Sequence, residues 1–299
     1  MKKVLVIGAS GLVGSRFIEM ASKDFDVTSV DEKTLDITNE ESVSKYFQEN
    51  KFDAVLNLAA FTDVAGAENQ RDDENGLAWK LNVLAPKYLA QETSKNNIFL
   101  IHFSTDFVFN DSENDKGPFD EDRPLPENKD NLSWYGWTKL LGEKSVRETS
   151  KNSAIVRIAY PFRSSFSGKA DWVRKIIELY DAGTLYPLFT DQTLTPIFVD
   201  DLVPALSKLI EMTAPGIYHM VSSDVGIYYD MGNYILEKVR GVKDAPQKAS
   251  LVEFMKTPGR NKRPIFGGLK TEKTQQKLGM KFKTWREMID EFVSQINKQ

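Results

Sequence analysis

The sequence predicts an α/β fold built on a doubly wound parallel sheet, and three observations support this prediction. Short runs of Val, Ile and Leu alternate with longer amphipathic segments, a glycine-rich turn follows the first run, and the pattern changes after Tyr160. Strands buried on both faces of a parallel sheet read as continuous apolar runs, and crossover helices join them. A chain of 299 residues has room for about two domains.

The apolar runs and amphipathic segments place the elements along the chain. We expect strands at Lys3–Ile7, Val27–Asp31, Ala54–Leu58, Phe99–Ser104 and Ser153–Ile158. We expect helices at Leu12–Lys23, Glu40–Glu49, Leu77–Lys95, Tyr135–Ser150, Asp171–Ala182 and Asp200–Met212, and a later strand at Gly216–Val221. We therefore expect residues 1–160 to form a Rossmann-type domain that residues 190–221 join, and residues 161–299 to form mainly a smaller, discontinuous lobe.

Composition narrows the chemistry and the partners. The chain is 41% hydrophobic and 27% charged, its net charge is −4, and it has no cysteine and two histidines, His102 and His219. These values favour no nucleic-acid or membrane partner, exclude thiol chemistry, and leave catalysis to Tyr, Lys, Ser, Thr, carboxylates or a cofactor. The apolar run Val4–Ile7 is too short for a secretory signal, so we expect a cytoplasmic protein. No metal site is expected, and Asp72–Glu74 reads as a solvated loop.

A glycine-rich turn gives the cofactor signal. Gly8, Gly11 and Gly14 follow a strand and open a helix with the spacing GxxGxxG, with Ser10 inside the turn. Glycines let backbone N–H groups approach a pyrophosphate, and the positive end of the helix dipole favours that anion.

The end of the next strand bears on which nicotinamide cofactor is bound. The strand is expected to end at Asp31, where a carboxylate accepts hydrogen bonds from the adenosine ribose. That carboxylate favours NAD, because it would repel a 2′-phosphate. Lys33 and Arg16 lie close in sequence, so NADP stays open.

Tyr135 and Lys139 give the catalytic signal. Four residues apart on a helix, their side chains share one face. At 4 Å and an effective dielectric constant of about 20, an ammonium stabilises a phenolate by about 4 kcal/mol before desolvation. Lowering the pKa of a phenol from about 10 toward neutrality needs a similar amount, so Tyr135 is expected to be a tuned general acid. A second pair, Tyr234 and Lys238, is assigned to an ordinary helix.

The combined motifs resemble the extended short-chain dehydrogenase/reductases. The matching segments are Gly8–Gly14, Asn57–Thr62, Ser104–Phe109 and Tyr135–Lys139. Leu35–Thr38, Asp191-Gln192 and Arg263-Pro264 narrow the resemblance to the dTDP-4-dehydrorhamnose reductase branch, over nearly the whole chain. This resemblance implies NAD(P)H-dependent reduction of a 4-keto nucleotide sugar, a substrate-binding role for the smaller lobe, and a homodimer.

The same resemblance implies roles for individual residues. Cofactor contacts fall to Leu12, Val13, Asp36, Ile37, Ala59, Ala60, Phe61 and Thr62, in addition to the glycine turn and Asp31. Thr105 would hydrogen-bond the substrate ketone, Tyr135 would protonate it, and Lys139 would hold the cofactor ribose and tune the tyrosine. Asp106 and Tyr160 would contact substrate, and Arg263 suits a substrate diphosphate.

Three departures from the family pattern keep other functions open. Ala65 and Gly66 replace an Asp-Lys pair, the segment Glu68–Asn82 is longer, and Tyr160 with the following Pro161-Phe162-Arg163 replaces the usual Trp region. All three are expected where substrate is held. The alternatives are a nucleotide-sugar epimerase or dehydratase, and a non-catalytic subunit similar to the one that accompanies methionine adenosyltransferase. His102 and His219 are expected to be core residues, and Trp134 and Trp137 to pack.

Overall fold

The computed structural model describes residues 1–112, 114–257 and 262–298, and the chain divides into two compact units. The first unit comprises Met1–Val108, Leu125–Arg157 and Val203–Tyr218. The second comprises Phe109–Pro124, Ile158–Leu202 and the chain from His219 onward. Both units are therefore discontinuous in sequence.

A six-stranded sheet forms the centre of the first unit. Its strands are β1 (Lys3–Ile7), β2 (Asp26–Val30), β3 (Ala54–Asn57), β4 (Phe99–Thr105), β5 (Ser153–Ile158) and β10 (Gly216–His219). Their order is β10-β5-β4-β3-β1-β2, with parallel pairing from β2 through β4. The chain passes from β1 outward to β2 and then returns to the other side of β1 as β3. This reversal is the switch point at which open α/β sheets bind ligands.

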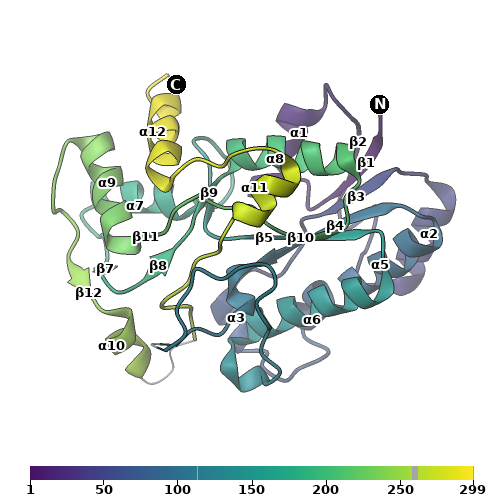
Figure 1. Ribbon diagram of the computed structural model, residues 1–299, viewed down its shortest axis with the longest axis horizontal. Coiled ribbons are helices and arrows are strands. Elements are labelled where there is room, and N and C mark those ends of the chain that lie inside the picture. Colours follow the sequence, from purple (N-terminus) through teal and green to yellow (C-terminus); the bar gives the residue numbers. More distant parts are fainter. Residues whose placement is uncertain (113, 258–261, 299) are drawn as a thin grey trace. The chain divides into compact units, whose positions relative to one another are not determined.

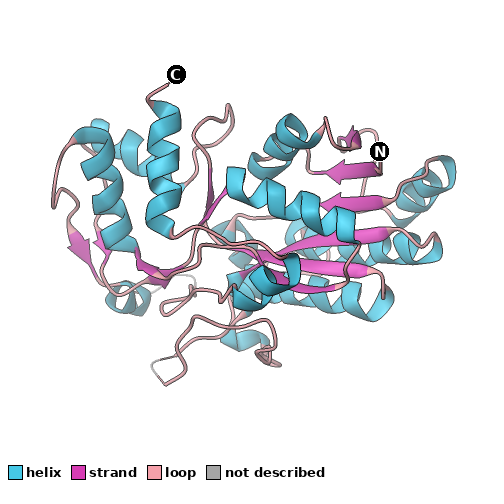
Figure 2. Ribbon diagram, turned by 45° about the horizontal axis from the view of Figure 1, so that its top comes forward, coloured by secondary structure: helices cyan, strands magenta, loops and turns pink. Residues whose placement is uncertain are grey.

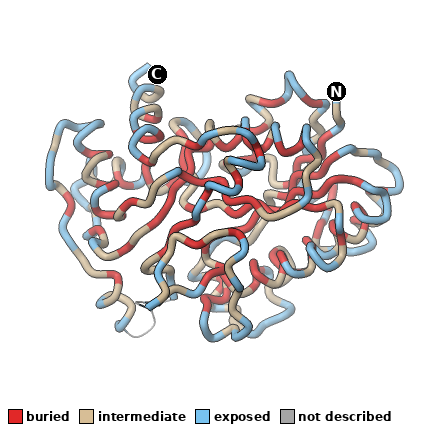
Figure 3. The backbone as a smooth tube through the Cα atoms, viewed as in Figure 1, coloured by how far each residue is buried: buried red, intermediate tan, exposed pale blue. Residues whose placement is uncertain are grey.

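Helices cover both faces of this sheet. They are α1 (Leu12–Ala21), α2 (Glu40–Glu49), α5 (Ala85–Lys95), α6 (Trp134–Thr149) and α8 (Val199–Met212). Helices α2, α5 and α6 lie on one face, and α1 and α8 lie on the other (Figures 1 and 2). The strands are the most deeply buried part of the unit (Figure 3). Leu5, Val55 and Leu100 of the strands pack against Phe47 of α2 and Leu89 of α5. The doubly wound fold predicted from the apolar runs is confirmed.

One predicted helix is divided into three pieces. The segment Leu77–Lys95 forms α4 (Leu77–Trp79), a π-helical turn η1 (Lys80–Leu84) and then α5. Pro86 has no N–H to give to the carbonyl of Asn82, four residues earlier, so the regular hydrogen-bond ladder cannot run through this point. The structure also adds a short helix α3 (Val64–Glu68), which Asp63 caps through the backbone N–H of Ala65.

The unit boundaries differ from the predicted domains of 1–160 and 161–299. Phe109–Pro124 belongs to the second unit because Phe109 stacks on Phe119 at 4.9 Å, and Phe119 N donates to the carbonyl of Gly268. The segment that rejoins the sheet unit is Val203–Tyr218, which is shorter than the predicted 190–221.

Helices and two-stranded ribbons build the second unit. The helices are α7 (Trp172–Asp181), α9 (Tyr228–Arg240), α10 (Leu251–Lys256), α11 (Glu272–Leu278) and α12 (Trp285–Ile296). The ribbons pair β6 (Pro161–Phe162) with β9 (Ile197–Phe198), β7 (Leu188–Phe189) with β12 (Lys248–Ala249), and β8 (Thr193–Leu194) with β11 (Gly226–Ile227). Helix α9 contacts both α7 and α12. Among the described residues, no helix is long and apolar enough to cross a membrane.

A buried ion pair joins α6 to β5. One edge of the Arg157 guanidinium donates to both carboxylate oxygens of Glu143, with Nε–Oε1 and Nη2–Oε2 distances of 2.9 and 2.6 Å. Both side chains are 1% exposed. A bidentate pair in this environment compensates two charges that would each be costly to bury alone.

We predict that Glu143→Ala lowers the free energy of unfolding by about 3–5 kcal/mol, because Arg157 loses its buried counter-charge. Glu148→Ala, which removes an exposed pair with Lys144 on the same helix, is the matched control and should change it by less than about 0.5 kcal/mol. Urea unfolding followed by tryptophan fluorescence measures both. Equal effects of the two substitutions would contradict the assignment.

Candidate active site

The glycine turn between β1 and α1 is shaped by close backbone contacts. Gly8 has φ +82°, and a Cβ there would lie 2.8 Å from the backbone nitrogen of Ala59. A Cβ on Gly14 would lie 2.3 Å from the carbonyl oxygen of Gly8. Gly11 is the N-cap of α1 and has no side chain, and the first turn of the helix carries no acidic residue. The turn therefore fits the pyrophosphate of a dinucleotide.

Two carboxylates follow β2, on the adenosine side expected from the sequence. Asp31 accepts hydrogen bonds from the backbone N–H and the hydroxyl of Thr34, at 2.8 and 2.7 Å. These hydrogen bonds, led by that of the hydroxyl, lower the pKa of Asp31. Asp36 is exposed and accepts from Thr38 in the same way, whereas the side chain of Ile37 is buried. Asp31 is thus exposed and ionised at neutral pH, as a ribose acceptor requires.

The loop after β3 is held in place by an amide from η1. Phe61 N donates to Oδ1 of Asn82 at 2.9 Å, and Nδ2 of Asn82 donates to the carbonyl of Phe61 at 3.1 Å. The same Nδ2 reaches the hydroxyl of Thr138 on α6 at 3.0 Å. Asn82 therefore ties the loop that begins at Ala59 to the helix that carries Tyr135. Sequence analysis missed Asn82, and its one signal was a polar residue at a buried helical position.

Thr105 and Tyr135 come together at the carboxyl end of β4. The Thr105 side chain lies beside the Tyr135 phenol, and its hydroxyl donates to Oδ1 of Asp106 at 3.1 Å. Helix α6 can approach this strand end because Gly136 has no side chain, since a Cβ there would lie 2.3 Å from the carbonyl oxygen of Phe107. The Phe107 ring packs edge-on against Tyr135, with centroids 5.5 Å apart. The geometry thus pairs a phenol with a hydroxyl that can share one carbonyl oxygen of a substrate.

Lys139 lies on the same helix, but its ammonium points to the strand. Nζ donates to the carbonyl of Phe103 at 2.7 Å, and the side chain is buried. Burial lowers the pKa of Lys139 to about 8, and the charge of Glu143 opposes that shift. Lys139 therefore carries a partly desolvated charge at neutral pH.

The pKa of Tyr135 is opposite to the sequence prediction. Burial raises it to about 12, the neighbouring Thr105 side chain opposes that rise, and the charge of Asp106 adds to it. The expected fall toward neutrality is wrong in this structure, because desolvation dominates and the Lys139 ammonium is bound to a backbone carbonyl. Tyr135 is consequently protonated at neutral pH, which is the form that can donate a proton.

The remaining candidates fall outside this group. His102 is fully buried and its Nδ1 lies 3.2 Å from Nδ2 of Asn57. Burial, with the nearby charge of Lys139, lowers its pKa well below the ordinary value, so the ring is neutral. His219 is buried in the second unit, with Nδ1 3.0 Å from the carbonyl of Lys270. Tyr234 and Lys238 both bind Asp290, at 2.8 and 3.1 Å, as expected for a pair on an ordinary helix.

Two predicted substrate residues belong to the second unit. Tyr160 has a positive φ of 44°, and its hydroxyl accepts a hydrogen bond from Gln192 at 2.9 Å. Its carbonyl accepts from the indole of Trp172 at 2.9 Å, and its ring lies 6.4 Å from that of Tyr228. The side chain of Arg263 is exposed. The second unit therefore holds the Tyr160 phenol by the Gln192 amide, within a cluster of aromatic rings. Sequence analysis did not predict that Gln192, Trp172 and Tyr228 surround Tyr160.

The doubly wound sheet with this strand-end arrangement defines the class of extended short-chain dehydrogenase/reductases. The chain belongs to the RmlD substrate binding domain family, whose sequence model matches residues 1–298. Among curated relatives, the spore coat polysaccharide biosynthesis protein SpsK of Bacillus subtilis is 30% identical over 297 residues, covering 99% of this chain and 98% of that protein. The dTDP-4-dehydrorhamnose reductase of Mycolicibacterium smegmatis is 27% identical, covering 99% and 86%.

Solved structures show the same fold. A dTDP-4-dehydrorhamnose reductase from Clostridium acetobutylicum superposes with a TM-score of 0.85 at 29% identity, covering 99% of each chain. A dTDP-4-dehydrorhamnose reductase from Bacillus anthracis, in complex with NADP, has a TM-score of 0.85 at 24% identity, covering 98% of this chain and 99% of that one. The resemblance inferred from the motifs is confirmed at the level of the family and the fold.

We predict that the stability of the protein depends on pH through Lys139. Its pKa is about 8 in the folded protein and near 10.5 when unfolded, so between these values the unfolded chain holds a proton that the folded protein has released. Stability therefore rises with pH across this window. Lys139→Met removes this contribution, and the wild type should gain on the order of 3 kcal/mol relative to it by pH 10.5. Urea unfolding at pH 7 to 10.5 measures this, and a constant difference between the two proteins would contradict it.

Proposed function

We propose that this chain is an NAD(P)H-dependent reductase that converts the 4-keto group of a nucleotide sugar to an alcohol, as dTDP-4-dehydrorhamnose reductases do. The observation that carries the proposal is the placement of the Thr105 and Tyr135 side chains beside each other at the carboxyl end of β4, with Lys139 one turn along α6. The names of the relatives support the substrate class. As a family member the chain is an oxidoreductase.

The residues present fit a dinucleotide cofactor. The glycine turn would hold the pyrophosphate, Asp31 would hold the adenosine ribose, and the loop that Asn82 fixes would line the nicotinamide half. Tyr135 and Lys139 would reach the nicotinamide ribose. A bound nicotinamide cofactor supplies the hydride that the carbonyl carbon accepts.

The protein supplies the proton and the alignment. Tyr135 is protonated at neutral pH and would give its phenolic proton to the carbonyl oxygen as that oxygen gains charge. Thr105 would donate a hydrogen bond to the same oxygen. When no substrate is present, the Thr105 hydroxyl donates this hydrogen bond to Asp106 instead. The ammonium of Lys139 would then stabilise the phenolate electrostatically, which requires it to leave the carbonyl of Phe103.

The substrate contacts are part of the same proposal. Asp106, Tyr160 and Arg263 would bind the nucleotide sugar, with Arg263 at the diphosphate. We also propose that the protein acts in the cytoplasm and that it is a homodimer. Size-exclusion chromatography with light scattering would test the oligomeric state.

The direct experiment mixes the protein with NADH or NADPH and a panel of 4-keto nucleotide sugars, and follows the loss of reduced-cofactor absorbance. We expect at least one sugar to oxidise the cofactor. Cofactor binding without turnover of any sugar would overturn the reductase proposal in favour of a non-catalytic subunit. Interconversion of sugars without net oxidation would favour an epimerase.

Tyr135→Phe should lower kcat by about 10²- to 10⁴-fold, because it removes the proton donor while leaving the ring in place. The affinity for cofactor, measured by fluorescence titration, should stay within a few-fold of the wild type. Tyr234→Phe is the matched control, since that phenol binds Asp290 on the surface of the second unit. Unchanged turnover in the Tyr135 variant would remove this residue from the mechanism.

Asp31→Ala should weaken NADH binding by about 10- to 100-fold, the range expected for losing hydrogen bonds to a charged acceptor. NADPH binding should weaken less, because the 2′-phosphate no longer meets a carboxylate. Asp26→Ala, at the exposed start of β2, serves as the control. A larger loss for NADPH than for NADH would reverse the cofactor preference.

A further inference from the structure

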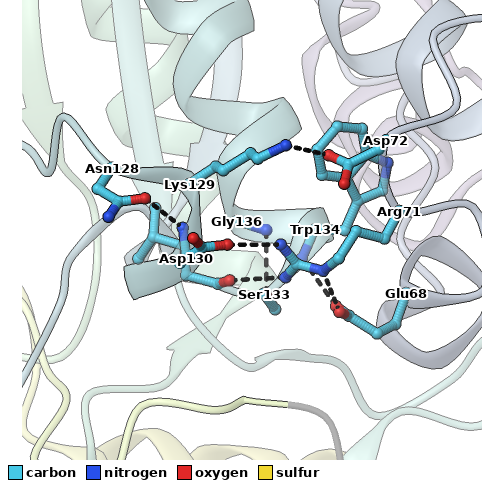
Figure 4. A network of polar contacts seen from close by, with 10 residues as sticks. Glu68, Arg71, Asp72, Asn128, Lys129, Asp130, Ser133, Trp134 and Gly136 are labelled. Carbon is cyan, nitrogen blue, oxygen red and sulfur yellow. Dashed lines mark hydrogen bonds and ion pairs between the residues drawn. The ribbon is translucent and has the colours of Figure 1, made fainter.

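The long segment that departs from the family pattern packs against the start of α6. Residues 68–72, at the end of α3 and just after it, lie more than fifty positions from residues 128–134 in sequence. The two segments nevertheless form one polar network (Figure 4). All of these residues belong to the first unit. Sequence analysis placed this segment at the substrate, whereas the structure shows that it contacts the helix that carries Tyr135.

Glu68 and Arg71 make the central contacts of this network. One carboxylate oxygen of Glu68 accepts the backbone N–H of Trp134 at 2.9 Å, and the other accepts Nε of Arg71 at 2.5 Å. Nη2 of Arg71 donates to the carbonyl of Leu132 at 2.9 Å. The pair therefore holds the backbone on both sides of Ser133, the residue that caps the helix.

These contacts satisfy backbone groups that a helix start leaves open. The first N–H groups of a helix have no partner within it, and a carboxylate there is also favoured by the helix dipole. The hydroxyl of Ser133 accepts the N–H of Gly136 at 3.1 Å, and Glu68 accepts that of Trp134. The N–H of Gly136 is thus capped by the neighbouring Ser133, and the N–H of Trp134 is capped by Glu68 from a distant segment.

The surroundings make the pair firmer than a surface ion pair. The side chains of Glu68 and Arg71 are only 24% and 26% exposed. The guanidinium of Arg71 lies 5.8 Å from the centre of the Trp134 ring, and that ring stacks on Trp79 at 5.9 Å. Lys129 and Asp72 add an outer ion pair at 2.6 Å.

We propose that Glu68 and Arg71 are positioning residues that set the reactive placement of Tyr135. Tyr135 directly follows Trp134, whose N–H Glu68 holds, so the pair fixes the backbone from which the phenol reaches Thr105. Neither residue contacts the reacting groups, and both act through the helix start. This inference rests on the proposed function for its effect on catalysis, but its structural part can be read independently.

The kinetic test compares Glu68→Ala with Glu68→Gln. The amide keeps an oxygen for the N–H of Trp134, whereas alanine removes it. We expect Glu68→Ala to lower kcat by about 10- to 100-fold with KM and cofactor affinity little changed, because a small misplacement of a catalytic group is costly. Glu68→Gln should recover most of this loss, and Glu148→Ala, which alters an exposed pair further along α6, should have no effect.

A second measurement needs neither substrate nor cofactor. With ¹³Cζ-labelled tyrosine, the resonance of Tyr135 is assigned by its absence in Tyr135→Phe. Hydrogen exchange of residues 132–138 is followed by mass spectrometry in the same variants. We expect Glu68→Ala to shift the Tyr135 resonance and speed exchange at the helix start, and Glu68→Gln and Glu148→Ala to do neither.

The outcomes separate the two proposals. An unmoved resonance and unchanged exchange in Glu68→Ala would overturn the positioning role, whatever the activity. The expected shift with unchanged kcat would also overturn it. If no sugar is reduced by the wild type, the proposed function fails, and the resonance still decides whether the pair places Tyr135. If Glu68→Ala does not fold, Arg71→Lys replaces it, because lysine cannot bind Glu68 and the carbonyl of Leu132 with the same planar fork.

Discussion

The close approach of α6 to its neighbours is the constraint on which the candidate site depends. Gly136 lets the helix touch the turn after β4, and Gly142 lets it touch η1, where a Cβ would lie 2.1 Å from the carbonyl oxygen of Asn82. Side chains at these two positions would push the helix outward. The placement of Tyr135 beside Thr105, the hydrogen bond of Asn82 to Thr138 and the hydrogen bond of Lys139 to Phe103 all require the helix at this distance.

Burial then sets the charges along this helix. Lys139, Glu143 and Arg157 are all buried, and the carboxylate whose charge acts on the Lys139 ammonium is itself bound to the Arg157 guanidinium. His102 stays neutral because burial, and then the charge of Lys139, lower its pKa well below the ordinary value. Tyr135 keeps its proton for the same reason that Lys139 loses some of its affinity for one, since both are desolvated. Desolvation therefore keeps Tyr135 protonated and makes the Lys139 amine a weaker base, one turn apart on the same helix.

The sequence predicted the parts of the fold that local pattern controls. β1, β5 and α2 have the predicted bounds, because continuous apolar runs mark the two strands and an amphipathic pattern marks the helix. The π-helical turn at Asn82 and the membership of Phe109–Pro124 in the second unit were not predicted, because long-range contacts decide them. The resemblance implied that Thr105 and Tyr135 act on one substrate carbonyl, and that assignment stays a prediction. The pKa of Tyr135 was not predicted, because charge spacing along a helix says nothing of desolvation.

The position of β10 at one edge of the sheet bears on how the protein folds during synthesis. β10 covers β5, and it comes from Gly216–His219, long after the other strands. Until the ribosome has released this part of the chain, β5 presents an apolar edge with unpaired backbone groups, which is a template for association with other chains. A fragment that ends near residue 160 would keep the same open edge permanently. Most of the first unit is therefore synthesised early, but its sheet is completed only after Gly216–His219 has been made.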